Sequence, residues 1–250
     1  MSGHSKWSTI KRKKGALDAK RGKLFARLIR AIEAAAKEGG PDPEANPTLA
    51  TAIQKARDNS VPKDNIDRAL KRAAGKESGA VEYEQVFYEG YAPGGVAVYV
   101  ECLTDNRNRA ANDVRSAFNK NGGSLADAGS VGYLFSRTGV IVVSAAEAGE
   151  DDVLAAAIDA GIEDVEVDAE TITVKTDASD LQDVRRALED AGVPVQSSEV
   201  TMLPSVNVPV EDEGRAKQVL RLIDALEDCD DVQNVYANFD IPDTVLEAVA

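Results

Sequence analysis

The chain has 250 residues and a mass of 26.5 kDa, enough for one large domain or for several small ones. Hydrophobic residues make up 43% of it and charged residues 29%, a composition that excludes a disordered protein. The formal net charge of −14 argues, for the chain as a whole, against a nucleic-acid binder.

The charge is, however, unevenly distributed along the chain. Residues 1–30 hold ten basic side chains and one acidic side chain, a net charge of +9. Residues 31–80 are balanced, whereas residues 136–250 carry seven basic and 27 acidic side chains, a net charge of −20. A basic segment on an acidic body indicates a polyanionic partner for the N-terminal end. The alternative is a basic helix face that only contacts solvent.

Residue content excludes further classes. Cys102 and Cys229 lie far apart and form neither a CxxC metal pair nor a disulfide framework, which favours a reducing compartment. His4 is the only histidine, so most zinc sites and histidine-based catalytic pairs are excluded. No apolar run has the length of a signal-peptide core or a membrane span. We therefore expect a cytoplasmic protein with no membrane attachment.

Three helices are predicted before residue 80. The first begins at Ala16, where leucines recur on one face, and ends at Gly39 and Gly40. Asn46 and Pro47 are typical of a helix start and open the second helix, which runs through residue 56. The third runs from residue 62 to residue 74, and residues 75–80 are a linker.

From residue 81 the pattern changes to strands. Residues 86–91 and 96–103 flank a Pro-Gly-Gly turn, which predicts a hairpin, and residues 107–120 have helical spacing. Six further segments then follow in the order β-α-β-β-α-β, the ferredoxin-like arrangement: 139–144, 151–160, 165–167, 171–175, 180–191 and 193–203. A last strand, helix and strand (206–210, 215–226 and 232–239) are too few to form a domain alone, so we expect them to complete the sheet of the hairpin.

The predicted fold class is therefore α+β and multidomain, with an N-terminal three-helix bundle followed by two α/β domains, at least one of them ferredoxin-like. Residues 1–80 form the basic arm and helical bundle. Residues 81–135 together with 205–240 form a discontinuous α/β domain, and residues 136–204 form the inserted ferredoxin-like domain.

The most specific motif surrounds Trp7, the only tryptophan, in the basic stretch at the N-terminus. Stacking of tryptophan on an unpaired base contributes about 1–3 kcal/mol in single-strand binders. Neighbouring side chains, namely His4, Ser5, Lys6, Lys11, Arg12, Lys13 and Lys14, supply donors and positive charge for phosphates. The alternative is that Trp7 packs on the helical bundle.

Two further clusters are candidate contacts. Lys63, Asn65 and Arg68 follow Pro62 at a helix start, where free N–H groups favour an anion, although Asp64 there is equally typical of simple capping. The second cluster places four donor-rich side chains at the end of a strand: Asn106, Arg107, Asn108 and Arg109. A contact surface is favoured over pure capping at this second position.

A metal-dependent nuclease is the enzymatic alternative to this interpretation. Five carboxylates could gather around Mg²⁺ as in a nuclease, but without a recognisable ligand spacing: Glu82, Glu84, Glu89, Glu101 and Asp105. No phosphate-binding loop, dinucleotide fingerprint or nucleophile elbow occurs. We therefore expect no catalytic residues, no metal and no cofactor.

Four segments carry a family resemblance: GHSKW with IKRKK at 3–14, VPKDNIDRALKR at 61–72, YEGYAPGGVAVYVECLTDNRNR at 88–109 and LRLIDALEDCDDVQNVYANFD at 220–240. They resemble the YebC family, bacterial relatives of the mitochondrial translational activator of cytochrome c oxidase subunit I, over essentially the whole chain. The resemblance implies three domains and a non-enzymatic role with nucleic acid. Its members are described both as DNA-binding transcriptional regulators and as ribosome-associated translation factors.

We therefore expect a monomeric translation factor that contacts rRNA or tRNA near the peptidyl-transferase centre of the large ribosomal subunit and relieves stalling at proline-rich sequences. The alternative is a transcriptional regulator that binds duplex DNA, for which no helix-turn-helix pair is evident. The candidate nucleic-acid contacts are His4, Ser5, Lys6, Trp7, Lys11, Arg12, Lys13, Lys14, Lys20, Arg21, Lys23, Lys63, Asn65, Arg68, Asn106, Arg107, Asn108 and Arg109.

Overall fold

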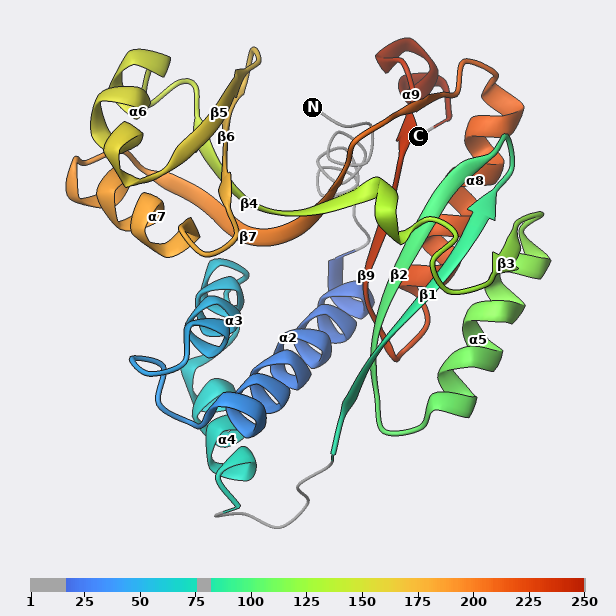
Figure 1. Ribbon diagram of the computed structural model, residues 1–250, viewed down its shortest axis with the longest axis horizontal. Helices are drawn as coiled ribbons and strands as arrows, with labels where there is room; N and C mark the ends of the chain where they lie inside the picture. Colours follow the sequence, from blue (N-terminus) through green and yellow to red (C-terminus); the bar gives the residue numbers. More distant parts are fainter. Residues whose placement is uncertain (1–16, 76–81, 250) are drawn as a thin grey trace. The chain divides into compact units, whose positions relative to one another are not determined.

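The computed structural model describes residues 17–75 and 82–249 (Figure 1). Its contacts divide the described chain into two compact units. Unit 1 contains residues 17–27, 82–136 and 203–249, and unit 2 contains residues 28–75 and 137–202. Within these residues no helix is both long enough and apolar enough to cross a membrane. The boundaries of the three predicted domains stay a prediction.

The three predicted N-terminal helices are confirmed as α2 (Leu17–Gly39), α3 (Pro47–Asp58) and α4 (Lys63–Ala73). The buried side chain of Asn46 organises the turn between the first two. Its Oδ1 accepts a hydrogen bond from the Leu49 N–H at 3.1 Å, and its Nδ2 donates to the carbonyls of Ala35 and Gly40, each at 2.9 Å. One asparagine therefore satisfies backbone groups at the end of one helix and at the start of the next.

Helices α2 and α4 are also joined by an ion pair. The Arg72 guanidinium donates from Nε to Glu33 Oε1 at 2.7 Å, and Glu33 is only 9% exposed. Large apolar side chains of all three helices, among them Ile32, Ile53 and Ile66, are buried. The polar pair therefore holds the two helices together beside an apolar interior.

Unit 2 also contains the predicted ferredoxin-like element order. The elements are β4 (Phe135–Ser144), α6 (Glu150–Ala157), β5 (Ile162–Val167), β6 (Thr171–Asp177), α7 (Leu181–Asp190) and β7 (Val195–Pro204). The strands lie in the order β5-β6-β4-β7, and β6 pairs antiparallel with both β4 and β5. Ile141 and Val174 of the sheet pack with Val153 of α6 and Leu188 of α7 in one core. The ferredoxin-like prediction is confirmed.

Unit 1 contains a second sheet, ordered β3-β1-β2-β9. The predicted hairpin is β1 (Glu84–Ala92) and β2 (Val96–Thr104), followed by α5 (Arg107–Lys120), β3 (Ser124–Ala126), α8 (Glu213–Glu227) and β9 (Val232–Ala237). Strand β9 pairs antiparallel with β2, so segments that flank the ferredoxin-like elements share one sheet. Val98 and Val100 of β2 pack against Phe118 of α5 and Leu222 of α8, which places the core on one face of the sheet.

The C-terminal elements differ from the prediction. The strand predicted at 206–210 is only β8 (Val208–Pro209), which pairs in parallel with β10 (Phe239–Asp240) in a separate two-stranded sheet. Pro209 lacks an N–H group, and a proline confines a strand to a short or edge position. Strand β3 and helix α9 (Asp243–Val249) were not expected from the sequence, because each is too short for a periodic pattern.

The hydrogen bonds of Asn46 lead to a stability prediction. Replacing Asn46 with alanine removes a helix cap and leaves buried carbonyls unpaired, so we expect the free energy of unfolding to fall by about 1–3 kcal/mol. Urea unfolding followed by far-UV circular dichroism measures this change. Asn119→Ala, at an exposed position of α5, is the control and should change stability by less than about 0.5 kcal/mol. Equal midpoints for the two variants would contradict the assigned role.

Candidate nucleic-acid interface

The structure describes only part of the predicted interface. His4, Ser5, Lys6, Trp7, Lys11, Arg12, Lys13 and Lys14 lie outside the described residues, as does the side chain of Lys20. Arg21 and Lys23 are exposed on α2. The Arg21 guanidinium lies 5.3 Å from the centre of the Phe25 ring, and Lys23 Nζ donates to the Asp228 carbonyl at 3.1 Å. Both cations are accessible, but each already has an intramolecular contact.

Helix α4 presents a second group of exposed cations. Lys63 begins the helix after Pro62, which provides no side-chain cap, so N–H groups of the first turn have no side-chain acceptor. Arg68 and Lys71 are exposed one and two turns further along. Arg68 donates from Nε to the Asp64 carbonyl at 3.3 Å and from its guanidinium to Asn65 Oδ1. Positive charge and a helix start without a side-chain cap therefore occur together on α4, a combination that favours an anion.

Sequence reasoning left two exposed cations out of the interface. Lys71 of α4 and Arg57 at the end of α3 are both exposed, and neither has an ion-pair partner among the described residues. Lys71 lies within the sequence motif at 61–72, three residues after Arg68 and so on the same side of α4. No spacing rule relates Arg57 to α4, since the two belong to different helices.

The cluster at residues 106–109 divides into two pairs. Asn106 caps α5 by accepting from the Arg109 N–H at 3.1 Å. The Arg109 side chain donates to both carboxylate oxygens of buried Asp231 at 3.0 and 2.8 Å and to Asp105 at 2.7 Å, and these hydrogen bonds raise its pKa. Arg107 and Asn108 remain exposed. Thus two of the four predicted contacts hold the helix in place and two face solvent.

Two of the carboxylates considered for a metal nuclease, Glu89 and Glu101, are used inside the fold. Glu89 is 8% exposed and accepts from the N–H groups of Gly129, Val131 and Gly132 at 2.6–2.8 Å. Burial raises its pKa, but these backbone hydrogen bonds outweigh burial and hold the pKa below 4.5. Within the described parts of the chain, no group of three or more His, Cys, Asp or Glu side chains could hold a metal ion.

Glu101 is similarly occupied by neighbouring strands. Its two carboxylate oxygens accept from Gln85 Nε2 at 2.7 Å, Asn234 Nδ2 at 2.8 Å and the Tyr236 hydroxyl at 2.9 Å. These donors belong to β1 and β9 on either side of β2. The carboxylate therefore links three strands of the sheet.

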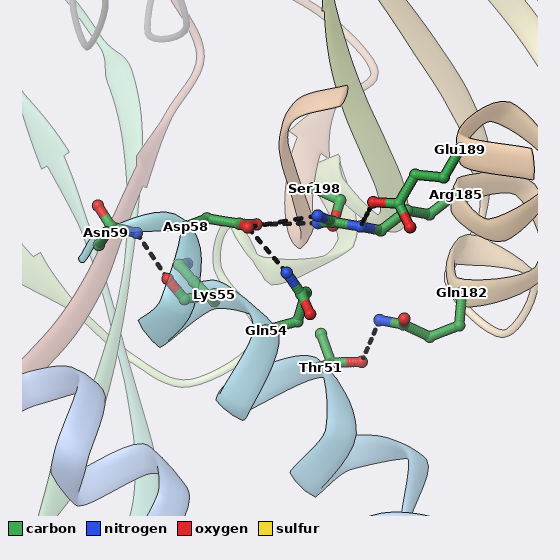
Figure 2. Close-up of polar contacts among 9 residues, drawn as sticks. All are labelled: Thr51, Gln54, Lys55, Asp58, Asn59, Gln182, Arg185, Glu189 and Ser198. Atoms are coloured by element: carbon green, nitrogen blue, oxygen red, sulfur yellow. Dashed lines mark hydrogen bonds and ion pairs between the residues drawn. The ribbon is translucent and has the colours of Figure 1, made fainter. Parts of the chain in front are cut away.

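Helix α3 is fixed within unit 2 by a polar cluster that involves α7 and β7 (Figure 2). Arg185 of α7, 8% exposed, donates from Nη1 to Asp58 at 2.9 Å and to Ser198 Oγ at 2.5 Å, and from Nε to Glu189 at 2.8 Å. Lys55 Nζ lies 2.6 Å from Glu199 Oε2 beside this pair. The cluster connects α3, the helix before α4, to the ferredoxin-like elements. It holds α3 in place, but its own charged groups are paired and are not candidate nucleic-acid contacts.

The architecture defines a class, an α+β protein with a small helical bundle and two four-stranded sheets. Residues 5–76 match the family model described as the TACO1/YebC protein N-terminal domain, and residues 83–239 match the model described as the TACO1/YebC second and third domain. The chain belongs to the TACO1/YebC family.

Relatives and a solved structure agree with this assignment. A protein of Salinispora tropica named "Probable transcriptional regulatory protein" is 60% identical over 98% of both chains, and one of the same name from Thermobifida fusca is 59% identical over 100% of both. The crystal structure of a conserved hypothetical protein, Aq1575 from Aquifex aeolicus, superposes with a TM-score of 0.80 at 48% identity, covering 90% of this chain and 93% of that one.

The buried cluster in Figure 2 predicts unequal effects for two neighbouring arginines. Arg185→Ala leaves Asp58 without its guanidinium partner, so we expect it to lower the free energy of unfolding by about 3 kcal/mol or more. Arg186 pairs at 3.5 Å with Asp183, and both side chains are 70% exposed, so Arg186→Ala is the control with an expected change below about 0.5 kcal/mol. Urea unfolding measures both, and similar losses would contradict this assignment.

The lowered pKa of Glu89 predicts a pH dependence of stability. A carboxylate with a depressed folded-state pKa stabilises the fold above its ordinary pKa, here 4.5, and loses that contribution as the pH falls through the folded-state value. Glu89→Gln should therefore be less stable than the wild type at pH 7, and its stability should fall less from pH 4.5 downward. Thermal unfolding across pH tests this. Exposed Glu147→Gln should keep the wild-type pH dependence, and the same profile for Glu89→Gln would refute the prediction.

Proposed function

We propose that this protein is a nucleic-acid-binding regulator of gene expression that acts without catalysis. The observation that carries the proposal is the segregation of charge, +9 in residues 1–30 against −20 in residues 136–250. Lys63, Arg68 and Lys71 add exposed positive charge on α4. Lysine and arginine contacts release counterions from nucleic acid and provide affinity without sequence preference. The printed names of the relatives, which describe transcriptional regulation, also support a nucleic-acid partner.

Two targets fit this surface. The names of the relatives favour duplex DNA and hence a transcriptional regulator. Trp7 within a basic segment favours unpaired bases of structured RNA, and with them a translation factor that contacts rRNA or tRNA near the peptidyl-transferase centre and relieves stalling at proline-rich sequences. In either function we propose a monomer that acts in the cytoplasm and makes its contacts through the basic residues before position 24 and those of α4.

A competition experiment separates the two targets. The protein is co-sedimented with purified large ribosomal subunits at physiological salt in the presence of excess duplex DNA. Binding that survives the DNA and is lost on removal of residues 1–15 supports the translation factor. Binding that the DNA abolishes supports the transcriptional regulator. Failure to bind either nucleic acid would overturn the proposal as a whole.

The cations of α4 lead to a quantitative prediction. Changing Lys63, Arg68 and Lys71 together to glutamine should weaken binding and reduce the slope of log K against log salt by about 2 for single strands or about 3 for duplex DNA. Fluorescence anisotropy with labelled oligonucleotides at several salt concentrations measures the slope. The control changes three exposed cations elsewhere, Arg186, Lys217 and Arg221, to glutamine, with the same change in net charge. Equal slopes for the two variants would remove α4 from the interface.

A further inference from the structure

The sheet of unit 1 has an edge that no described strand pairs. Strand β1 pairs with β2 along its whole length, residues 84–92. On its other side β3 pairs only with Glu89–Tyr91, so residues 84–88 face no partner strand among the described residues. In an antiparallel ladder every second residue of such a stretch directs its N–H and C=O outward. The edge therefore offers backbone hydrogen bonds to an added strand.

The side chain of Glu89 keeps this edge open. Its carboxylate accepts from the N–H groups of Gly129, Val131 and Gly132, so the chain after Ala126 is held at this side chain and does not continue the β3 pairing along residues 84–88. The Tyr91 hydroxyl reinforces this course by donating to the Ser130 carbonyl at 3.2 Å. These contacts therefore explain why no described strand continues the line of β3 beside residues 84–88.

A hollow of about 350 Å³ lies beside the open edge. Its floor and wall come from residues 86–89 of β1, and small side chains leave the space free: Ala111 of α5, Ala126 of β3 and Ala128. Arg107 and Asn108, from the first turn of α5, complete the lining. The side chain of Asn108 makes no hydrogen bond within the part of the chain that the structure describes. Arg107 Nη1 lies 3.0 Å from Glu84, but these side chains are 64% and 55% exposed, so the ion pair exchanges readily.

We propose that this edge is a docking site for an extended peptide, which adds antiparallel to β1 in line with β3. The unpaired backbone groups of residues 84–88 bind its main chain. A small apolar side chain enters the hollow beside Ala111 and Ala126. A carboxylate of the peptide binds Arg107 and Asn108, where the start of α5 adds to the attraction for negative charge. Two predicted nucleic-acid contacts are thereby assigned to a peptide, independently of the basic surface.

The test is a titration of the full-length ¹⁵N-labelled protein with synthetic hexapeptide pools, followed by amide chemical shifts. One pool has randomised sequences and free C-terminal carboxylates, and the matched pool carries an N-methyl group on every backbone amide, which removes the N–H donors of both strand edges. We expect the first pool to shift the amides of residues 84–88 and 107–111, and the N-methylated pool to leave them unchanged. Shifts of these amides by neither pool, or equally by both, would overturn the proposal.

Variants and an RNA probe complete the test. Ala126→Phe fills the hollow and should weaken binding by about tenfold or more, whereas Ala155→Phe, exposed on α6, should not. Arg107→Ala should abolish the preference for free carboxylates over an amidated pool, which tests the site even if Ala126→Phe does not fold.

A hexauridine oligonucleotide should leave the amides of residues 84–88 unshifted. If it shifts them and the peptides do not, the edge belongs to the nucleic-acid interface instead.

Discussion

Asp231 makes the contacts on which the sheet of unit 1 depends. Its carboxylate accepts two hydrogen bonds from Arg109, and its carbonyl accepts one from the Leu103 N–H at 2.9 Å. It is only 4% exposed and directly precedes β9. These contacts attach the start of β9 to the end of β2 and to the first turn of α5, so Val232 and Val235 enter the core in a fixed register. Loss of the arginine would leave a buried carboxylate without its partner.

Local chemistry made much of the fold predictable. Asn46 and Pro47 identified a helix start, and the Pro-Gly-Gly turn, with Gly94 and Gly95 at φ of +88° and +78°, identified a hairpin. The alternation of strands and helices after residue 136 was sufficient for the ferredoxin-like order. The two-residue strands β8 and β10 could not be predicted, because they depend on pairing between segments thirty residues apart and carry no period of their own.

The candidate site was less predictable, because a partner distant in sequence decides which charges stay available. Arg107 and Arg109 look equivalent in the sequence, but Asp231, 122 residues away, engages only Arg109. Likewise Arg72 is used by Glu33 on another helix, whereas Lys71 beside it remains exposed. Charge counting identifies a basic region of the chain, and its role as an interface stays a prediction. Only the tertiary contacts show which cations face solvent and which are held in ion pairs within the fold.

The separation of β2 from β9 also has a consequence during synthesis of the chain. Val98 of β2 cannot pair with Ala237 of β9 until the intervening ferredoxin-like elements have been translated. At a synthesis rate of about 5–20 residues per second, the chain from the end of β2 to the start of β9 takes about 6 to 25 s to make. For that time the nascent hairpin exposes the apolar edge of β2 to other chains and to chaperones. The ferredoxin-like elements, which are contiguous in sequence, can fold within the same interval.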